Sequence, residues 1–250
     1  MPYEINGIQY PSVTQITGQL DKPALLAWAS NCAVDHIRDN LDALLDPIDA
    51  HRGDAVLEEA RKAYTTKRDT AADTGTLVHK AIELHIKGGN GYEVFGWENK
   101  DSMRGYEAFL DWEEKNHVVW EQTEVEVVSE LYGYAGRFDA IAVVNGHRYL
   151  IDFKTSSGIY DEMSWQLCAY RQAYNEGLEE GQEPIENMAI LHLDKNTGEP
   201  TFKPITSEIQ RKTEIFNHLT WLYYLLKNRR LKNNPWVLRA KGEDEEEVSF

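Results

Sequence analysis

The stretch GRFDAIAVVNGHRYLIDFKTS, residues 136–156, consists of two apolar runs joined by Asn145-Gly146. Asn-Gly between β-branched runs is the strongest short-range signal for a β-hairpin with a two-residue type I′ turn. Such a turn fixes the register, so residues equally far from the turn face each other. In this register Asp139 lies across from Asp152, and we expect two carboxylates side by side on one face of the sheet.

Two facing carboxylates are unfavourable unless something neutralises them. Like charges placed opposite each other destabilise a hairpin, and a buried carboxylate pair needs a cation or must hold a proton. Burial is expected because both faces are apolar: Phe138, Ala140, Ile151 and Phe153 on one, and Ile141, Val143 and Leu150 on the other. Lys154 lies two residues after Asp152 and so shares its face. Two acids and one lysine on a buried sheet predict a metal site.

Length and composition exclude several classes of protein. The chain has 250 residues, 42% of them hydrophobic, which suits one large α/β domain or two small ones. It has no apolar run of membrane-spanning length and does not begin with a basic and then apolar leader, so we expect neither a membrane span nor a signal peptide. Two cysteines, Cys32 and Cys168, indicate a reducing compartment and are too few for a four-cysteine cluster. These features predict a cytoplasmic protein.

The net charge of −16 argues against broad, non-specific attraction to nucleic acid. The charge is unevenly spread, because residues 242–247 contain five acids whereas residues 226–241 contain six basic residues and no acid. A local basic segment can bind phosphate on an acidic protein. Equally, these cations can complement the dipole at a helix end, and the sequence leaves both interpretations open.

Hydrophobic periodicity predicts helices first and strands afterwards. Helices are expected over residues 22–40, 55–66, 76–87, 102–116 and 160–176 and from about 207 to 232, with an extended entry over 11–20. The helix over 76–87 is expected to start at Asp73-Thr74-Gly75-Thr76 and to stop at Gly88-Gly89-Asn90. Strands are expected from Val118, in the central hairpin, and in a second hairpin over 188–193 and 201–204.

This order predicts an α/β fold with a central mixed β-sheet flanked by helices. We expect a single domain over residues 1–241, mostly helical over 1–117, with the sheet core and C-terminal helix over 118–241. Residues 242–250 are expected to form a disordered acidic tail.

Further polar residues accompany the hairpin at helical spacing. His79 and Glu83 share one helix face, and Gln166 and Tyr170 share another. Taken alone, His79 is more typical of a structural histidine than of a ligand. Taken together, the segments resemble the RecB-type branch of the PD-(D/E)xK nucleases: Gly75-x-x-x-His79-x-x-x-Glu83, Gly136-Arg137-Phe138-Asp139, Ile151-Asp152-Phe153-Lys154-Thr155-Ser156 and Gln166-x-x-x-Tyr170. The resemblance covers about residues 12–206, and the opening SVTQITG with KPALLAW is similar to that of the mitochondrial genome maintenance exonuclease and phage exonucleases.

The resemblance implies a restriction-endonuclease-like core and a role for each residue. His79, Asp139, Asp152 and the Phe153 carbonyl would hold Mg²⁺ or Mn²⁺. Lys154 would act beside the catalytic acids Asp139, Asp152 and Glu83, orienting the attacking water or neutralising the transition state. Gln166, Tyr170, Thr155 and Ser156 would contact DNA. The implied activity is that of a DNA exonuclease, acting from single-stranded ends in replication, recombination or repair, in a bacterial or phage-infected cell.

Two sequence features that occur in or beside some relatives are absent here, and their absence narrows the expected type of nuclease. Some members of the branch carry four cysteines around an iron–sulfur cluster, and this chain lacks them. It also lacks a G-x-x-x-x-G-K-[ST] phosphate loop, so any helicase would be a separate protein. Its acidity leaves a second hypothesis, a catalytically inactive regulator that binds DNA or protein on a nuclease fold. A non-haem iron oxygenase is disfavoured because His79 lies on a predicted helix and His147 in a turn.

Two further features have competing interpretations. Aromatic residues of the N-terminal half are able to stack on bases, although each one singly is more typical of the core: Trp28, Tyr64, Trp97, Tyr106 and Trp112. The acidic tail is either a solubilising end, a docking element for a replication or recombination protein, or a competitor with DNA for Arg229 and Arg230.

Overall fold

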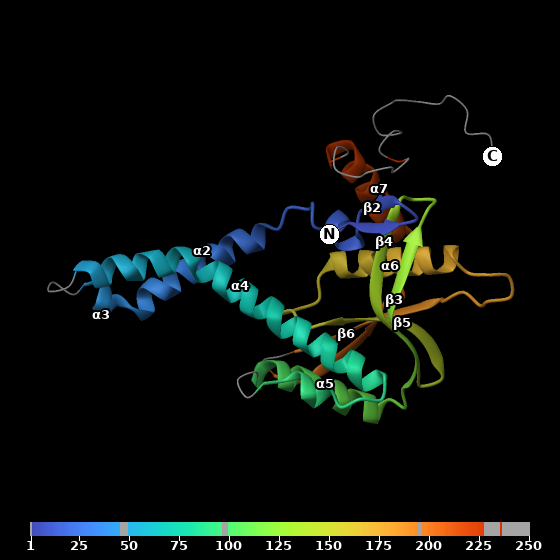
Figure 1. The fold of residues 1–250 in the computed structure, drawn as a ribbon, viewed down its shortest axis with the longest axis horizontal. Coiled ribbons are helices and arrows are strands. Elements are labelled where there is room, and N and C mark those ends of the chain that lie inside the picture. The colour runs from blue at the N-terminus through green and yellow to red at the C-terminus, as the bar shows by residue number, and fades with distance from the viewer. Residues whose placement is uncertain (1, 46–49, 97–99, 195–196, 228–235, 237–250) are drawn as a thin grey trace. The chain divides into compact units, whose positions relative to one another are not determined.

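The computed structural model describes residues 2–45, 50–96, 100–194, 197–227 and 236 (Figure 1). The predicted acidic tail, most of the basic segment over 226–241 and Trp97 lie outside these residues. In chain order the elements are β1 (Tyr3–Ile5), β2 (Ile8–Tyr10), α1 (Val13–Thr17), α2 (Pro23–Asp39), α3 (Leu41–Leu44), α4 (Ala50–Ile86), the 3₁₀ helix η1 (Gly91–Val94), α5 (Lys100–Lys115), β3 (Val119–Ser129), β4 (Tyr134–Val144), β5 (His147–Lys154), α6 (Asp161–Glu176), β6 (Asn187–Leu193), β7 (Pro200–Pro204) and α7 (Ile209–Lys227). None of the helices in the described part of the chain is long and apolar enough to span a bilayer.

The chain divides into two compact units. One comprises residues 1–19 and 77–250, and the other comprises residues 20–76. The smaller unit contains α2, α3 and most of α4, and its buried side chains include Cys32, Val56 and Ala60. The larger unit contains both sheets and the remaining helices.

A mixed five-stranded sheet forms the centre of the larger unit, as the sequence predicts. The strand order is β3-β4-β5-β6-β7. Only β5 and β6 are parallel among these neighbours, and the other three pairs are antiparallel. A parallel pair needs a crossover connection, and α6 provides it between β5 and β6.

Helices cover both faces of this sheet, so its central strands are apolar on both sides. The α6-side core joins residues of α1, α6 and α7, such as Leu167 and Phe216, to Ile141 and Leu150 of the sheet. The α5-side core joins the end of α4 and α5 to Ala142, Ile151 and Leu191. Figure 1 shows α5 on one side of the strands and α6 on the other. Each fully buried large apolar side chain contributes about 1.5–3 kcal/mol to folding.

The central hairpin has the predicted register. Pairs run from Val144↔His147 to Ala140↔Ile151, and Asn145 and Gly146 have φ values of 50° and 84°, as a type I′ turn requires. One expectation about its faces is wrong. Phe138 packs in the α6-side core, whereas Ala140, two residues later, packs in the α5-side core. Strand β4 therefore exchanges faces at Asp139.

The neighbouring strand is irregular at the same level. Thr123 pairs with Ala140 and Val125 pairs with Phe138, which places Glu124 level with Asp139. Glu124 has a φ of 54°, in the left-handed region. A left-handed residue inside a strand breaks the alternation of side chains along that strand, here β3.

Two helix predictions also need correction. The helices expected over 55–66 and 76–87 are parts of one helix, α4, because the hydroxyls of Thr74 and Thr76 donate to the carbonyls of Thr70 and Ala72 instead of capping a new start. Its predicted stop is confirmed by Gly88, which has a φ of 84°. The entry over 11–20 is not simply extended.

Residues Val13–Thr17 of this entry form helix α1, which begins with a capping box. The Ser12 side chain accepts from the Gln15 backbone N–H, and the Gln15 side chain accepts from the Ser12 N–H, both at 3.0 Å. Ser-x-x-Gln is a known start signal, so the helix was identifiable from the sequence.

Candidate functional site

Four of the polar residues singled out in the sequence meet at the open end of the β4–β5 hairpin, the end opposite its turn: His79, Asp139, Asp152 and Lys154. The ladder stops at Ala140↔Ile151, so Asp139 and Asp152 do not form a further pair. Instead the Asp139 carboxylate accepts the backbone N–H of Phe153 at 2.5 Å and contacts His79 Nδ1 at 3.0 Å. A side chain of β4 thus bonds the backbone of β5, which ties Asp139 to both α4 and β5.

Asp152 and Lys154 form the second half of the site. They share a face of β5, as predicted, and the Lys154 ammonium is ion-paired with Asp152 Oδ2. Asp152 is only 4% exposed. Apart from Lys154, no hydrogen-bond donor in the described part of the chain reaches this buried oxygen.

The pKa values of the two carboxylates are shifted in opposite directions. Burial raises the pKa of Asp139, but the charge and hydrogen bond of His79, with Lys154 and the Phe153 N–H, outweigh burial and lower it below the usual value. For Asp152, burial and repulsion from Asp139 outweigh the attraction of Lys154, so its pKa is raised. Asp139 is therefore the firmly ionised acid, and Asp152 is the one that binds a proton more readily.

The basic partners respond to these acids. Burial by itself lowers the pKa of His79 and of Lys154. For each, the neighbouring aspartates outweigh burial and the pKa is raised, chiefly by Asp139 for His79 and by Asp152 for Lys154. Lys154 is therefore a cation at neutral pH, suited to stabilising negative charge.

The donor set fits a hard divalent cation by its chemistry. Carboxylate oxygens and an imidazole are ligands of Mg²⁺ and Mn²⁺, and Asp152 Oδ2 is a buried oxygen neutralised by an ion pair alone. Within the described ranges, no three His, Cys, Asp or Glu side chains converge as a ready-made metal site. His79 and Lys154 supply the positive charge that a cation would otherwise bring.

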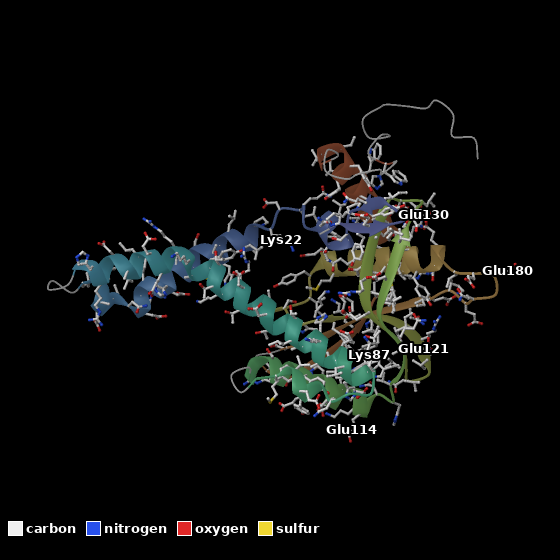
Figure 2. The ribbon with its side chains drawn as sticks, viewed as in Figure 1. Lys22, Lys87, Glu114, Glu121, Glu130 and Glu180 are labelled. Carbon is white, nitrogen blue, oxygen red and sulfur yellow. The ribbon has the colours of Figure 1, made fainter. Side chains whose placement is uncertain are left out.

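Glu83 lies one turn after His79 on α4, as the sequence predicts. Its carboxylate is ion-paired with Lys87, near the end of the same helix (Figure 2). The charge of Glu83 also contributes to raising the pKa of Glu124, after the larger effects of burial and of Asp139. Glu83 thus belongs to the electrostatic surroundings of Glu124.

The residues expected to contact DNA are positioned by contacts with several different helices and strands. Gln166 donates through Nε2 to the Thr17 hydroxyl of α1 at 3.0 Å. Tyr170 is buried, and its ring lies against Gly136, where an added Cβ would approach Tyr170 Cε1 to 2.6 Å. Burial, and then Asp152 and Asp139, raise the pKa of Tyr170 well above its usual value, which places the phenol near both acids.

The loop after β5 carries Thr155 and Ser156, both half-buried. The Ser156 hydroxyl donates to the Gly158 carbonyl at 2.7 Å. The Ser156 carbonyl lies 2.6 Å from Nε2 of His192, a buried residue on β6. Strand β6 therefore anchors the loop that follows Lys154.

The aromatic residues proposed for base stacking have different surroundings. Tyr106 and Trp112 are buried in the α5-side core, as the simpler interpretation predicts. In the smaller unit, Trp28 and Tyr64 meet edge to face with centroids 5.1 Å apart, and Arg68 lies over the Tyr64 ring.

Four residues near the site have no role predicted from the sequence: Thr17, Glu124, Arg137 and His192. Thr17 was identifiable in principle, because the capping box predicts α1. The left-handed backbone of Glu124 is not predictable from its residue type, because Gly or Asn usually occupies a left-handed position.

A family model described as the PD-(D/E)XK nuclease superfamily matches residues 96–236, more than half of the 250 residues. The chain belongs to this superfamily. The match contains Asp139, Asp152 and Lys154 but begins after His79 and Glu83. PD-(D/E)XK nucleases generally use divalent metal ions.

No curated protein matches the chain. Among solved structures, the PD-(D/E)XK protein resembles the crystal structure of a "Putative exonuclease" from Eubacterium rectale. The two share 16% sequence identity over 69% of each chain, with a TM-score of 0.42.

Proposed function

We propose that the protein is a metal-dependent DNA exonuclease of the RecB-type branch that acts from single-stranded ends. The observation that carries the proposal is the open end of the hairpin, where Asp139, Asp152 and Lys154 gather on adjacent strands beside His79. Buried acids with divergent pKa values are typical of catalytic sites. Membership of the nuclease superfamily supports hydrolysis of phosphodiester bonds.

Each side chain has a task in this proposal. His79, Asp139, Asp152 and the Phe153 carbonyl would hold Mg²⁺ or Mn²⁺, which would polarise the scissile phosphate and lower the pKa of the attacking water. Lys154, protonated at neutral pH, stabilises the charge that develops on the phosphate. The other two expected roles are those of Glu83, as a supporting acid, and of the DNA contacts Gln166, Tyr170, Thr155 and Ser156.

A digestion assay tests the proposal. Linear single-stranded DNA labelled at either end, a circular strand and a duplex are each incubated with Mg²⁺, Mn²⁺ or EDTA. We expect linear strands to be degraded while circles survive, and the labels then give the polarity. Lys154→Ala should abolish cleavage. The matched control is Lys115→Ala, which removes an ammonium paired with Asp111 on the exposed surface of α5.

Other outcomes would redirect the proposal. Cleavage of circles would make the enzyme an endonuclease with the same site. Binding of DNA without cleavage in either metal would favour the inactive regulator instead. A role of residues 242–250 in docking a replication or recombination protein is tested separately, by deleting them and measuring partner binding.

A further inference from the structure

Arg137 is a second cation beside the site that the proposed chemistry does not use. It precedes Asp139 by two residues on β4, and its Nε lies 2.8 Å from Glu124 Oε2 on β3. The Arg137 side chain is 52% exposed, whereas that of Glu124 is 21% exposed. A largely buried carboxylate therefore holds one edge of an exposed guanidinium.

The backbone that places this carboxylate is strained. Glu124 has a φ of 54° in the middle of β3, level with Asp139. The other non-glycine residues with positive φ lie in turns or between elements: Asn6, His117, Asn145 and Glu208. A left-handed non-glycine residue costs about 1–3 kcal/mol and persists where surrounding structure enforces it, often at functional sites. The strain here positions the residue that holds Arg137.

Two phenols lie within electrostatic reach of Arg137. Burial raises the pKa of Tyr3 on β1 and of Tyr170 on α6, and the charge of Arg137 opposes the rise in both. Both phenols therefore keep their protons at neutral pH and are able to donate hydrogen bonds. Tyr170 also senses Asp152 and Asp139, and Glu124, which holds Arg137, lies level with Asp139 on the neighbouring strand.

The guanidinium has unused binding capacity. In the part of the chain that the structure describes, Arg137 makes no side-chain hydrogen bond or ion pair other than that with Glu124. Its terminal nitrogens therefore remain for a ligand, and a guanidinium binds phosphate oxygens with two parallel hydrogen bonds. Lys154 is engaged by the buried Asp152. A protein with net charge −16 needs such a local cation to hold a polyanion.

We propose that Arg137, held toward the site by Glu124, binds a backbone phosphate of the nucleic acid next to the scissile bond. The inference rests on the proposed function, because the phosphate is that of the nuclease substrate. Arg137 is a substrate-positioning residue, and it contributes to binding more than to the chemical step.

Binding without cleavage gives the test. Fluorescence anisotropy follows a labelled single-stranded oligonucleotide bound by the full chain in EDTA, at several salt concentrations. For Arg137→Ala we expect Kd to rise about tenfold, and the slope of log K against log salt to fall by about 0.7, the value for one lost phosphate contact on a single strand. Arg137→Lys should keep the slope and recover part of the affinity, because it keeps the charge but not the paired donors.

The matched control is Arg211→Ala, which removes an exposed guanidinium of α7 that is paired with Glu208. This control should leave both Kd and slope unchanged. Arg137→Gln is a second variant with a smaller change in packing. In Mg²⁺, KM of the Arg137 variants should rise about tenfold with kcat nearly constant. Unchanged Kd, slope and KM in folded Arg137 variants would overturn the inference. Failure of the nuclease proposal would appear differently, as wild-type protein that binds DNA but does not cleave it.

Discussion

The two ends of the β4–β5 hairpin are built on different principles. At the turn end, backbone hydrogen bonds join the strands in a regular register from Val144↔His147 to Ala140↔Ile151. At the open end, the Asp139 side chain bonds the Phe153 backbone and β4 exchanges faces. The turn end follows the general rules of hairpins. The open end breaks them with buried charges, and local departures of this kind are typical of functional regions.

The difference also concerns stability. Gly146 adopts its positive φ without strain, and the paired strands bury apolar side chains on both faces. At the open end, burial opposes the charged form of all four ionisable groups: His79, Asp139, Asp152 and Lys154. These groups are tolerated because each one neutralises another. Substitutions at the open end should therefore change activity most, and those at the turn end should change stability alone.

Among the further substitutions that compare the two ends of the hairpin, the largest effect is expected for Asp139→Asn. The amide oxygen still accepts the Phe153 N–H, so the fold is kept, but the charge that faces His79 is lost. Cleavage of linear single-stranded DNA in Mg²⁺ should fall about 10³-fold, as when one electrostatic group of a site is removed. The control is Asp111→Asn, which removes an exposed carboxylate paired with Lys115 on α5. Retention of more than a tenth of the wild-type rate by folded Asp139→Asn would contradict the assignment.

Much of the central hairpin was predictable from the sequence because its signals are local. Asn145-Gly146 specifies the turn, the turn specifies the register, and the register brings Asp152 to the level of Asp139. The shared face of Asp152 and Lys154 follows from the alternation of a strand. The mixed sheet flanked by helices follows from the order of elements.

The remaining features depend on contacts between distant segments. The pairing of Gln166 with Thr17 joins residues 149 positions apart, and no spacing rule predicts it. The face exchange at Asp139 lies level with the left-handed Glu124 on β3, a residue type that rarely adopts this backbone angle. The prediction of a helix start at residues 73–76 was wrong for a different reason. Helix α4 continues through these residues, because residue types that favour helix caps are also tolerated inside a long helix.

A smaller effect is expected for Gly136→Ala, near the open end. The added Cβ would lie 2.6 Å from Tyr170 Cε1 and 3.0 Å from Val13 Cγ2, so the buried Tyr170 ring must move. Overpacking of this kind costs about 1–3 kcal/mol of unfolding free energy, and the displaced ring should also slow DNA cleavage. Urea unfolding and the cleavage rate measure the two effects. Gly158→Ala is the control, because its nearest neighbour atom is 3.9 Å away; equal behaviour of the two variants would refute the packing argument.

At the turn end, Gly146→Ala should reduce stability alone. The added Cβ meets no atom within 4 Å, so the cost is that of forcing a non-glycine residue to a φ of 84°. We expect a loss of about 1 kcal/mol in unfolding free energy and an unchanged rate per folded molecule. Asn145→Gly is the matched control, since glycine adopts its φ of 50° freely. A large loss of activity without unfolding would show that the turn end also serves the site.

The smallest effect is the pH dependence contributed by His79. Its pKa is raised above the value of 6.5, since Asp139 outweighs the opposing effect of burial. Its stabilisation of the fold is therefore complete below pH 6.5 and is lost as the pH rises through the higher folded pKa. The difference in Tm between wild type and His79→Gln, measured in EDTA, should be largest in weak acid and should shrink toward alkaline pH.

Asp139 limits the same effect from the acid side. Its pKa is lowered below 3.8, so its contribution is present above that pH and is lost only as the pH falls through the lower folded pKa. The pair therefore stabilises the open end across the interval between the two folded pKa values. In an Asp139→Asn background the pH-dependent part of the His79→Gln difference should largely vanish, because Asp139 is its main cause. A difference that grows with pH, or that persists without Asp139, would show that burial rather than the ion pair dominates this end of the hairpin.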